Sequence, residues 1–368
     1  MGDPSRRIWP PRLRGDQHVE TTDDLLADPF PTEPPTLAEP ESVAAPPPRL
    51  TLAAVRLAAL GLALVLTIGI TMARLFVGGP PSIEELRATA GVDGWSTLVI
   101  GVKDDQPGTA FRDPATGIWS GFDIDVAYMV AEDLGFRRSE VRFYGLESED
   151  RARMQATDLR GERVPVQMVI ASYSITPDRE ARDEVTFSQS YLYTEQSVLT
   201  LAGHSKVSAL EDFRGKKVCS LSTATSVSAP EKAGAAVHQR NRISECVEEL
   251  REGKVEAVST DAAILAGYKA KYPKEFAHWD LGLDTTERWG VNVGQNQALK
   301  TLVDLTFYRS LKDPSDNRWE DAFQRNFLSE APANNRPVNA VNTPIAQGQQ
   351  PDVVKPDVRE QPWERDIP

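Results

Sequence analysis

The sequence predicts an α/β fold, because two kinds of pattern alternate along its middle part. Short apolar runs, such as residues 98–102 and 164–171, have the length and composition of buried strands. Longer segments between them, such as residues 122–135, repeat apolar residues every three or four positions, as amphipathic helices do. Strands that alternate with helices form mostly parallel sheets.

The expected elements can be placed in chain order. A short helix over 83–90 comes before the first strand, and Gly135 ends the helix that begins at residue 122. Further strands are expected at 216–221 and 255–259, and further helices at 226–238, 243–252, 261–272, 297–312 and 317–328.

Length, charge and histidine content narrow the possible functions. With 368 residues, the chain is long enough for two globular domains and additional segments. Its net charge of −13 argues against binding nucleic acid, which needs a basic face. The four histidines and two cysteines lack the spacing of a zinc or haem site, so we expect no metal and no cofactor.

One segment predicts a membrane anchor. Residues 57–73 form an unbroken uncharged run between Arg56 and Arg74, and apolar residues continue on both sides. At about 1.5 Å per residue this run nearly crosses a hydrocarbon core of about 30 Å. A buried core helix is the alternative, but the run has no polar face. The segment before it is too long for an ordinary cleaved signal peptide, so we expect a permanent single-pass helix over 50–77.

The two cysteines bear on the compartment. Cys219 and Cys246 are spaced for one disulfide, worth about 3–4 kcal/mol, which would persist only in an oxidising compartment. Two reduced, buried cysteines are the alternative. The arginines on the two sides of the anchor are nearly balanced and do not set its orientation. We therefore expect the N-terminus in the cytoplasm and the large domain outside the cell.

Both ends of the chain have the composition of disordered segments. Residues 1–49 are rich in Pro, Asp, Glu and Arg and are expected to form a disordered cytoplasmic tail. Residues 331–368 are rich in Pro, Asn, Gln and Asp and are expected to be disordered too. Residues 78–93 would link the anchor to the folded domain.

A group of polar residues follows the apolar run 164–171. Ser172 and Ser174 would lie on one side of an extended chain, and Arg179 follows five residues later. A planar guanidinium and two hydroxyls could clamp a small carboxylate. The alternative is a strand end and a turn, in which Thr176 or Asp178 caps a short helix and Arg179 lies in solvent.

Other polar residues follow other strands, where ligands of α/β sheets bind. Arg179 and the backbone N–H groups near Thr225 would bind the carboxylate of an α-amino acid. Asp261 would bind its ammonium group, unless it only caps the helix that follows. Lys103 and Arg151 would each be ordinary surface cations if alone, but with the others they suit a ligand that carries a second carboxylate.

Four segments resemble the type II periplasmic solute-binding proteins for polar amino acids, the bacterial extracellular solute-binding protein family 3. Residues 172–179 are similar to the family's Ser/Thr-x-Ser/Thr-x-Thr-x-x-Arg signature, and residues 121–127 read Gly-Phe-Asp-Ile-Asp-Val-Ala as that family's motif does. Residues 187–191 resemble Phe-Ser-x-Pro-Tyr, with Ser190 in place of proline. Residues 261–267 are similar to the segment that carries the ammonium-binding aspartate in glutamate and aspartate binders.

The resemblance implies a two-lobed fold with two crossover strands and a ligand cleft that closes by a hinge motion. Lobe 1 would comprise 94–193 and 290–330, and lobe 2, which would contain both cysteines, 194–289. It also implies that Lys103, and Arg151 on a looser alignment, contact the ligand side chain. The loop Thr223-Ala224-Thr225-Ser226 departs from the family's Gly-Ser/Thr-Thr-Ser, so carboxylate contacts there would fall to Thr225 and backbone N–H groups.

The expected function is therefore ligand binding without catalysis. We expect an extracytoplasmic protein for glutamate or aspartate, or else their amides, that delivers ligand to the permease subunits of an ABC transporter. A sensor that signals through a membrane partner to a cytoplasmic regulator is the alternative. An enzyme on the same fold is disfavoured, because Gly-x-Ser-x-Gly does not occur and no histidine falls at an expected strand end.

Overall fold

The computed structural model describes residues 51–76, 79–279, 281, 286–330, 332–334 and 350–360. The expected cytoplasmic tail over 1–49 lies outside the described residues, as does most of the expected C-terminal tail.

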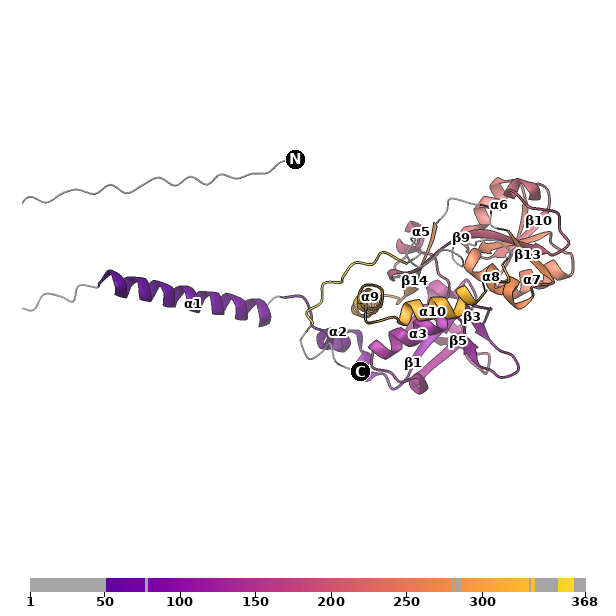
Figure 1. The fold of residues 1–368 in the computed structure, drawn as a ribbon. Coiled ribbons are helices and arrows are strands. Elements are labelled where there is room, and N and C mark those ends of the chain that lie inside the picture. Colours follow the sequence, from indigo (N-terminus) through magenta and orange to yellow (C-terminus); the bar gives the residue numbers. More distant parts are fainter. Residues whose placement is uncertain are drawn as a thin grey trace, which may run out of the picture. The chain divides into compact units, whose positions relative to one another are not determined.

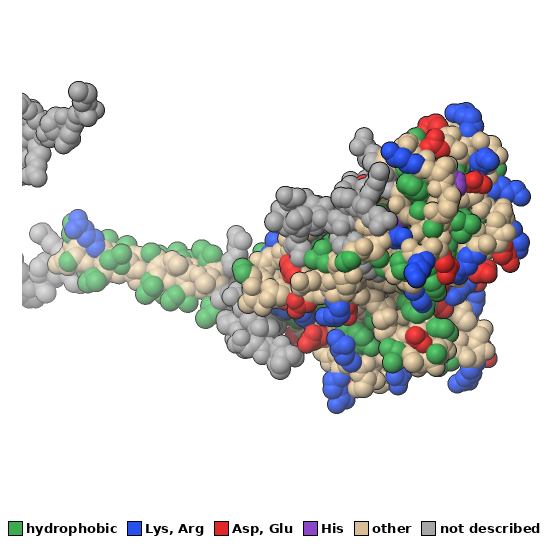
Figure 2. All heavy atoms as spheres, turned by 45° about the vertical axis from the view of Figure 1, so that its right-hand side comes forward, with side chains coloured by type: hydrophobic (Ala, Val, Ile, Leu, Met, Phe, Trp, Pro, Cys, Tyr) green, Lys and Arg blue, Asp and Glu red, His purple; other side chains and the backbone are tan. Residues whose placement is uncertain are grey.

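Helix α1 (Leu52–Phe76) is an apolar helix of 25 residues. Its stretch Leu52–Ala73 has a mean hydropathy of 2.2, and its most apolar window has none of its residues buried. Hydrophobic side chains cover the helix along its length (Figure 2). At about 1.5 Å per residue these residues span about 33 Å, so α1 is long and apolar enough to cross a membrane.

The rest of the described chain folds around one sheet with the strand order β11-β10-β12-β9-β14-β8-β1-β5-β6-β7, with β13 paired to β9. We call its first part lobe 1: β1 (Leu98–Val102), β5 (Val141–Gly145), β6 (Gln155–Thr157), β7 (Arg163–Pro165), β8 (Met168–Ile170) and β14 (Thr286–Asn292). Lobe 2 contains β10 (Lys217–Leu221), β11 (Ala236–Arg240), β12 (Ala257–Asp261) and β13 (Phe276–Trp279). Strands β8, β1 and β5 are parallel, and so are β12, β10 and β11. The predicted α/β fold is confirmed.

Helices pack on both lobes (Figure 1). Lobe 1 carries α2 (Ile83–Ala90), α3 (Phe122–Asp133), α4 (Asp150–Arg153), α5 (Pro177–Glu180), α9 (Gln297–Lys312) and α10 (Arg318–Asn326). Lobe 2 carries α6 (Ser228–Lys232), α7 (Ile243–Arg251) and α8 (Ala262–Lys271). A small separate sheet consists of β2 (Asp105–Gln106), β3 (Ala110–Arg112) and β4 (Trp119–Ser120).

One long strand joins the two lobes. Strand β9 (Phe187–Leu201) has 15 residues; its first part pairs with β14 and its last part with β12 and β13. Its partner β14 also runs toward lobe 2, where Thr286 lies opposite Glu195. These two antiparallel strands are where a hinge motion would bend the chain. The expected lobe boundaries at 193/194 and 289/290 stay a prediction.

The disulfide is present. Cys219 in β10 and Cys246 in α7 are both fully buried, and their sulfur atoms lie 2.01 Å apart. The bond attaches α7 to the sheet of lobe 2.

The predicted helix over 226–238 is wrong in its second half. Helix α6 ends at Lys232, and Gly234 has a φ of +92°, which stops the helix at this point. The following residues, Ala236–Arg240, pair in parallel with β10. The helical periodicity of this short segment is overridden by its place at the edge of the sheet.

Part of the C-terminal region is folded, although its composition predicts disorder over 331–368. We call residues 350–360 the strap. Val353 and Val358 are buried in the core of lobe 1. The side-chain amide of Gln189 bonds the N–H and the carbonyl of Val354 at 2.6 and 2.7 Å. The Arg359 N–H donates to the carbonyl of Pro81 at 2.9 Å. Two well-placed valines are too few to change an average composition, so the prediction missed the strap.

Candidate functional site

The structure buries six of the seven residues expected to bind ligand. They lie at the carboxyl ends of β1, β8 and β12 or in the short helices α4 and α5: Lys103, Arg151, Ser172, Ser174, Arg179 and Asp261. Buried charged side chains are rare unless they are paired, so this group needs an explanation beyond folding.

Arg179 is held by the first turn of α5. The hydroxyl of Thr176 caps this helix by accepting from the Arg179 N–H, so the capping alternative is correct for Thr176. The Arg179 side chain, however, is buried and not in solvent. Its guanidinium donates to the carbonyls of Ser174 at 2.6 Å and of Thr223 at 2.5 Å. Thr223 belongs to lobe 2, so Arg179 forms a hydrogen bond between the two lobes.

Tyr173 contacts two of the cations, a role that the sequence did not reveal. The guanidinium carbons of Arg151 and Arg179 lie 4.6 and 4.7 Å from the centre of its ring. The electron-rich faces of the ring attract both guanidinium groups. Burial, and next the repulsion from Arg179, lowers the pKa of Arg151 to about 10. Its Nη2 is buried without a hydrogen-bond partner among the described residues.

Lys103 follows β1 of lobe 1, and its side chain is buried where lobe 1 meets lobe 2. Its ammonium donates to the hydroxyl of Ser148 at 3.0 Å and to the carbonyls of Leu146 at 3.3 Å and Asn241 at 3.4 Å. All three acceptors are neutral. Burial therefore lowers the pKa of Lys103 to about 7, although the nearby Asp105 acts in the opposite direction.

Asp261 is the main buried carboxylate that faces this group from lobe 2. It stands at the N-cap position of α8, but its side chain accepts no hydrogen bond from that helix, so the capping alternative does not account for it. It accepts from the Trp289 indole at 2.6 Å. Burial, with help from the neighbouring carboxylate of Glu287, raises the pKa of Asp261. Glu287 is itself buried in β14. The sequence did not predict it as a site residue, because the pattern of a strand does not reveal which of its polar residues are buried.

Ser172 acts through its backbone. Its φ of +47° is unusual for a residue other than glycine, and its carbonyl accepts from Arg151 at 3.1 Å. Its hydroxyl donates to the Gln106 amide oxygen at 2.8 Å. Gln106 is fully buried, and its Nε2 has no hydrogen-bond partner in the described part of the chain. The amide of Gln106 is thus a further group that a ligand could bond.

Asp123 joins two of the sequence motifs. It accepts from the Ser172 N–H at 2.9 Å and from the Tyr191 hydroxyl at 2.9 Å, and burial raises its pKa to about 7. Gly121, two residues earlier, has a φ of +124°, and a Cβ there would lie 2.3 Å from the carbonyl oxygen of Thr109. The motif over 121–127 therefore supports the unusual backbone at Ser172. Its fixed glycine and aspartate could have signalled this role.

Two expected residues have weaker connections. Ser174 forms a backbone bridge with Trp289 and is buried, but no hydrogen bond of its hydroxyl is found in the described region. Thr225 begins a short 3₁₀ turn and is only half-buried. Thr223, not Thr225, contacts lobe 1, through its carbonyl and through a 3.4 Å bond from its hydroxyl to the Ser148 carbonyl.

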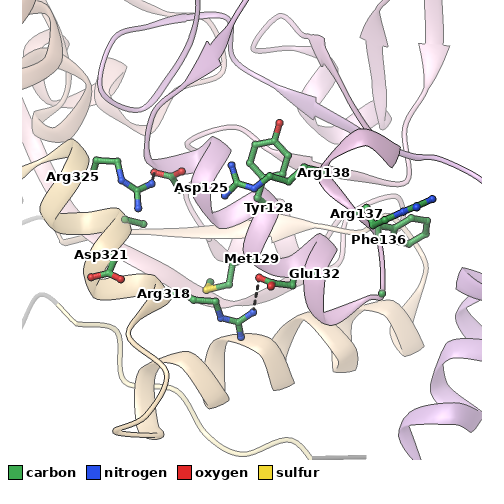
Figure 3. A pocket seen from close by; sticks show the side chains of 12 residues that line it. Asp125, Tyr128, Met129, Glu132, Phe136, Arg137, Arg138, Arg318, Asp321 and Arg325 are labelled. Atoms are coloured by element: carbon green, nitrogen blue, oxygen red, sulfur yellow. Dashed lines mark hydrogen bonds and ion pairs between the residues drawn. The ribbon is translucent and has the colours of Figure 1, made fainter. Parts of the chain in front are cut away.

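A hollow of about 400 Å³ lies between α3 and α10 and shares no residue with this group (Figure 3). Most of its arginines have carboxylate partners: Arg318 pairs with Asp133 at 2.7 Å, and Arg325 with Asp125 at 2.9 Å. These ion pairs hold α10 against α3. The hollow is therefore explained by helix packing.

Comparison with known proteins identifies the family. Residues 98–324 match the family described as bacterial extracellular solute-binding proteins, family 3. This chain belongs to that family. It is 31% identical over 261 residues to the glutamate-binding protein GluB of Corynebacterium glutamicum, covering 64% of this chain and 84% of GluB. It is 28% identical over 262 residues to the ABC transporter glutamine-binding protein GlnH of Bacillus subtilis, covering 69% and 90%.

Solved structures agree with this assignment. An ancestral arginine-binding protein bound to glutamine superposes with a TM-score of 0.53 at 28% identity, over 63% of this chain and 98% of that protein. The predicted two-lobed fold is thereby confirmed. Weaker sequence matches include the membrane-bound lytic murein transglycosylase F of Ectopseudomonas mendocina, which is 24% identical and of which 45% is covered.

Proposed function

We propose that this protein binds an acidic amino acid, glutamate or aspartate, between its lobes and delivers it to an ABC transporter. One observation carries the proposal: three cations, Lys103, Arg151 and Arg179, are buried near one another where the two lobes meet. Opposite them are the carboxylates of Asp261 and Glu287. The printed hydrogen bonds of the three cations go to carbonyl and hydroxyl oxygens, and none goes to a carboxylate among the described residues. A ligand with a net negative charge would supply the missing carboxylate partner.

Each ligand group has a complementary partner. Arg179 offers a two-pronged donor for the α-carboxylate, and Asp261 a carboxylate for the α-ammonium. Lys103 has only neutral acceptors, and Arg151 has an unpaired buried donor, so these two suit a second carboxylate. Gln106 would bond either a carboxylate or an amide. Asparagine and glutamine are therefore the second choice of ligand.

The named relatives support transport. GluB is named for glutamate, and GlnH is named as an ABC transporter component that binds glutamine. In our proposal α1 anchors the binding domain on the outer side of the membrane, with the N-terminus in the cytoplasm. A sensor that signals through a membrane partner is a second candidate, favoured by the roughly 50 residues that precede α1 and that ligand delivery does not need.

Titration calorimetry of the full chain in detergent tests the proposal. L-Glutamate should bind without being altered, and saturation at about 100 times the dissociation constant should stabilise the protein by about 2.7 kcal/mol. Arg179→Ala should weaken binding of every amino acid by at least about tenfold, because it removes the shared carboxylate contact. Lys103→Ala should weaken glutamate and aspartate far more than glutamine.

The matched control is Arg137→Ala, which removes an exposed arginine paired with Glu140 within lobe 1. It should leave every affinity unchanged. An equal loss for charged and uncharged ligands in Lys103→Ala would contradict the assignment of Lys103 to the side-chain carboxylate.

A further inference from the structure

We propose that a latch outside the ligand group holds the two lobes together and sets the apparent affinity of the protein. The latch consists of Asp104 and Asp105 of lobe 1 and Arg242, Ser244 and Tyr268 of lobe 2. The inference about affinity rests on the proposed ligand binding, whereas the inference about lobe closure does not.

Three contacts make up the latch. The Arg242 guanidinium pairs with the Asp104 carboxylate at 2.6 Å. The backbone N–H of Ser244 donates to the Asp105 carboxylate at 2.9 Å. The Tyr268 hydroxyl donates to the backbone carbonyl of Asp105 at 2.5 Å. All three join residues more than 130 positions apart in the chain, and all three cross from one lobe to the other.

Asp105 supplies a helix cap from the opposite lobe. Ser244 lies in the first turn of α7, and the residue at the N-cap position, Arg242, provides no side-chain cap of its own. A carboxylate at this end bonds an otherwise unpaired N–H and interacts favourably with the helix dipole. Cys246 fixes the same helix to β10 through the disulfide. The latch therefore binds helix α7, which the disulfide prevents from moving independently of lobe 2.

The latch is adjacent to the ligand group, and its Asp105 and Asp104 carboxylates raise the pKa of Lys103 against the larger effect of burial. The closed fraction, which does not depend on this charge interaction with the ligand, is therefore the primary test of the latch. Lys103 directly precedes Asp104 in the chain, and Asn241 directly precedes Arg242. The Asn241 carbonyl accepts hydrogen bonds from Lys103 and from the Ser148 hydroxyl. Closing the latch thus brings the lobe 2 loop against the cation expected to bind the ligand side chain. Lobe closure and ligand contact are coupled through neighbouring residues.

Burial ranks the three contacts. Asp105 and Tyr268 are buried, whereas the side chains of Arg242 and Asp104 are 34% and 25% exposed. Water screens an exposed ion pair, so this pair contributes less than the buried bonds to Asp105. Asp105→Ala removes the buried bond to the Ser244 N–H and leaves the Tyr268 bond to the backbone carbonyl in place. We expect this loss to have a larger effect than Arg242→Ala.

Energy transfer between two dyes in the full chain, in detergent, measures closure directly. The dyes are attached through Arg142→Cys in lobe 1 and Lys232→Cys in lobe 2, both exposed positions. Both natural cysteines are bonded to each other and will not take up label. Without ligand, Asp105→Ala should lower the closed fraction. Its dissociation constant for L-glutamate should rise about fivefold to twentyfold, and that of Arg242→Ala about twofold to fivefold.

Controls separate a latch from a general loss of structure. Arg137→Ala removes an ion pair that lies within lobe 1, and it should change neither the closed fraction nor the dissociation constant for L-glutamate. Asp104→Ala combined with Arg242→Ala should have no more effect than Arg242→Ala alone, because the two residues act as a pair. Circular dichroism should be unchanged in all variants that are compared.

The outcomes distinguish the two proposals. If L-glutamate does not bind but the closed fraction falls in Asp105→Ala, the latch stands and the proposed ligand is wrong. If L-glutamate binds and neither the closed fraction nor the affinity changes in Asp105→Ala and Arg242→Ala, the latch is wrong. Purely additive effects of Asp104→Ala and Arg242→Ala would also overturn the pairing.

Discussion

Lys103 is a buried ammonium whose hydrogen bonds all go to neutral oxygens within the described residues. Such a group lowers the stability of the fold, because its charge has left water without forming an ion pair, and the nearby Asp105 offsets only part of that cost. Arg151 also lowers the stability of the fold, because its buried Nη2 has no hydrogen-bond partner among the described residues. Stability sacrificed at a few buried cations is what a site for an anionic ligand would require.

The effect of Lys103 on stability depends on pH. Its pKa is lowered from 10.5 to about 7 in the folded protein, so between these values the unfolded chain holds a proton that the folded chain has lost. Stability therefore rises as the pH increases from about 7 to about 10.5, and the full penalty applies below about 7.

Lys103→Met should remove this dependence. The variant should be more stable than the natural protein at about pH 6 by roughly 2–5 kcal/mol, and the difference should vanish near pH 10. Urea unfolding of the full chain at several pH values measures it. Lys232→Met, at an exposed position, is the control and should follow the natural protein. If the unfolding free energy of Lys103→Met still rises between about pH 7 and pH 10 as in the natural protein, Lys103 is not the group that causes this rise.

Single residues of the site were only partly predictable. Arg179 and Asp261 stand in motifs with local signatures, so their positions could be expected. Tyr173, Asn241 and Thr223 could not, because each matters through a contact with a segment distant in the chain. The ligand roles of all seven predicted residues remain predictions.

At the scale of elements, the disulfide fixes α7 to the sheet of lobe 2. Replacing both Cys219 and Cys246 by serine should lower the free energy of unfolding by about 3–4 kcal/mol, from the loop of 27 residues that the bond closes. Urea unfolding measures this loss. A reductant should destabilise the natural protein by a similar amount and leave the variant unaffected. Equal sensitivity of both proteins to reductant would contradict the prediction.

The strap is the second element whose contribution can be measured. Ending the chain after residue 349 removes Val353 and Val358 from the core, and we expect a loss of about 2–4 kcal/mol in unfolding free energy. Ending it after residue 360 keeps the strap and is the control. Equal stability of the two truncated proteins would show that the strap only rests on lobe 1.

Helices and strands were predictable where the local pattern is strong. The helix over 83–90 and the strand over 98–102 are confirmed, because their apolar spacing matches their burial. The segment 236–240 was assigned to the wrong element, since its pairing with β10 depends on a strand far away. The exceptional length of β9 could not be predicted from any local window, because it results from serving two lobes.

At the scale of the whole molecule, the order of the motifs was sufficient to predict the two-lobed fold. The closeness of the lobes was not predictable, because it depends on cross-lobe contacts such as Arg179 with Thr223 and Asp105 with Ser244. These contacts involve backbone groups on one side, and no sequence pattern identifies a backbone carbonyl as a partner. The sequence predicts a negatively charged ligand, but it does not predict the contacts between the lobes.

The hydrogen bond from the Arg359 N–H to the Pro81 carbonyl holds the strap against the segment that precedes α2, so two segments far apart in the sequence lie next to each other. Entry and exit of the polypeptide lie side by side, so a short linker could join them without disturbing the core. New ends could then be opened at the exposed tip of the β6–β7 hairpin, at Arg160 and Gly161. A circularly permuted domain of this kind would carry a fused reporter at the edge of the sheet formed by β7.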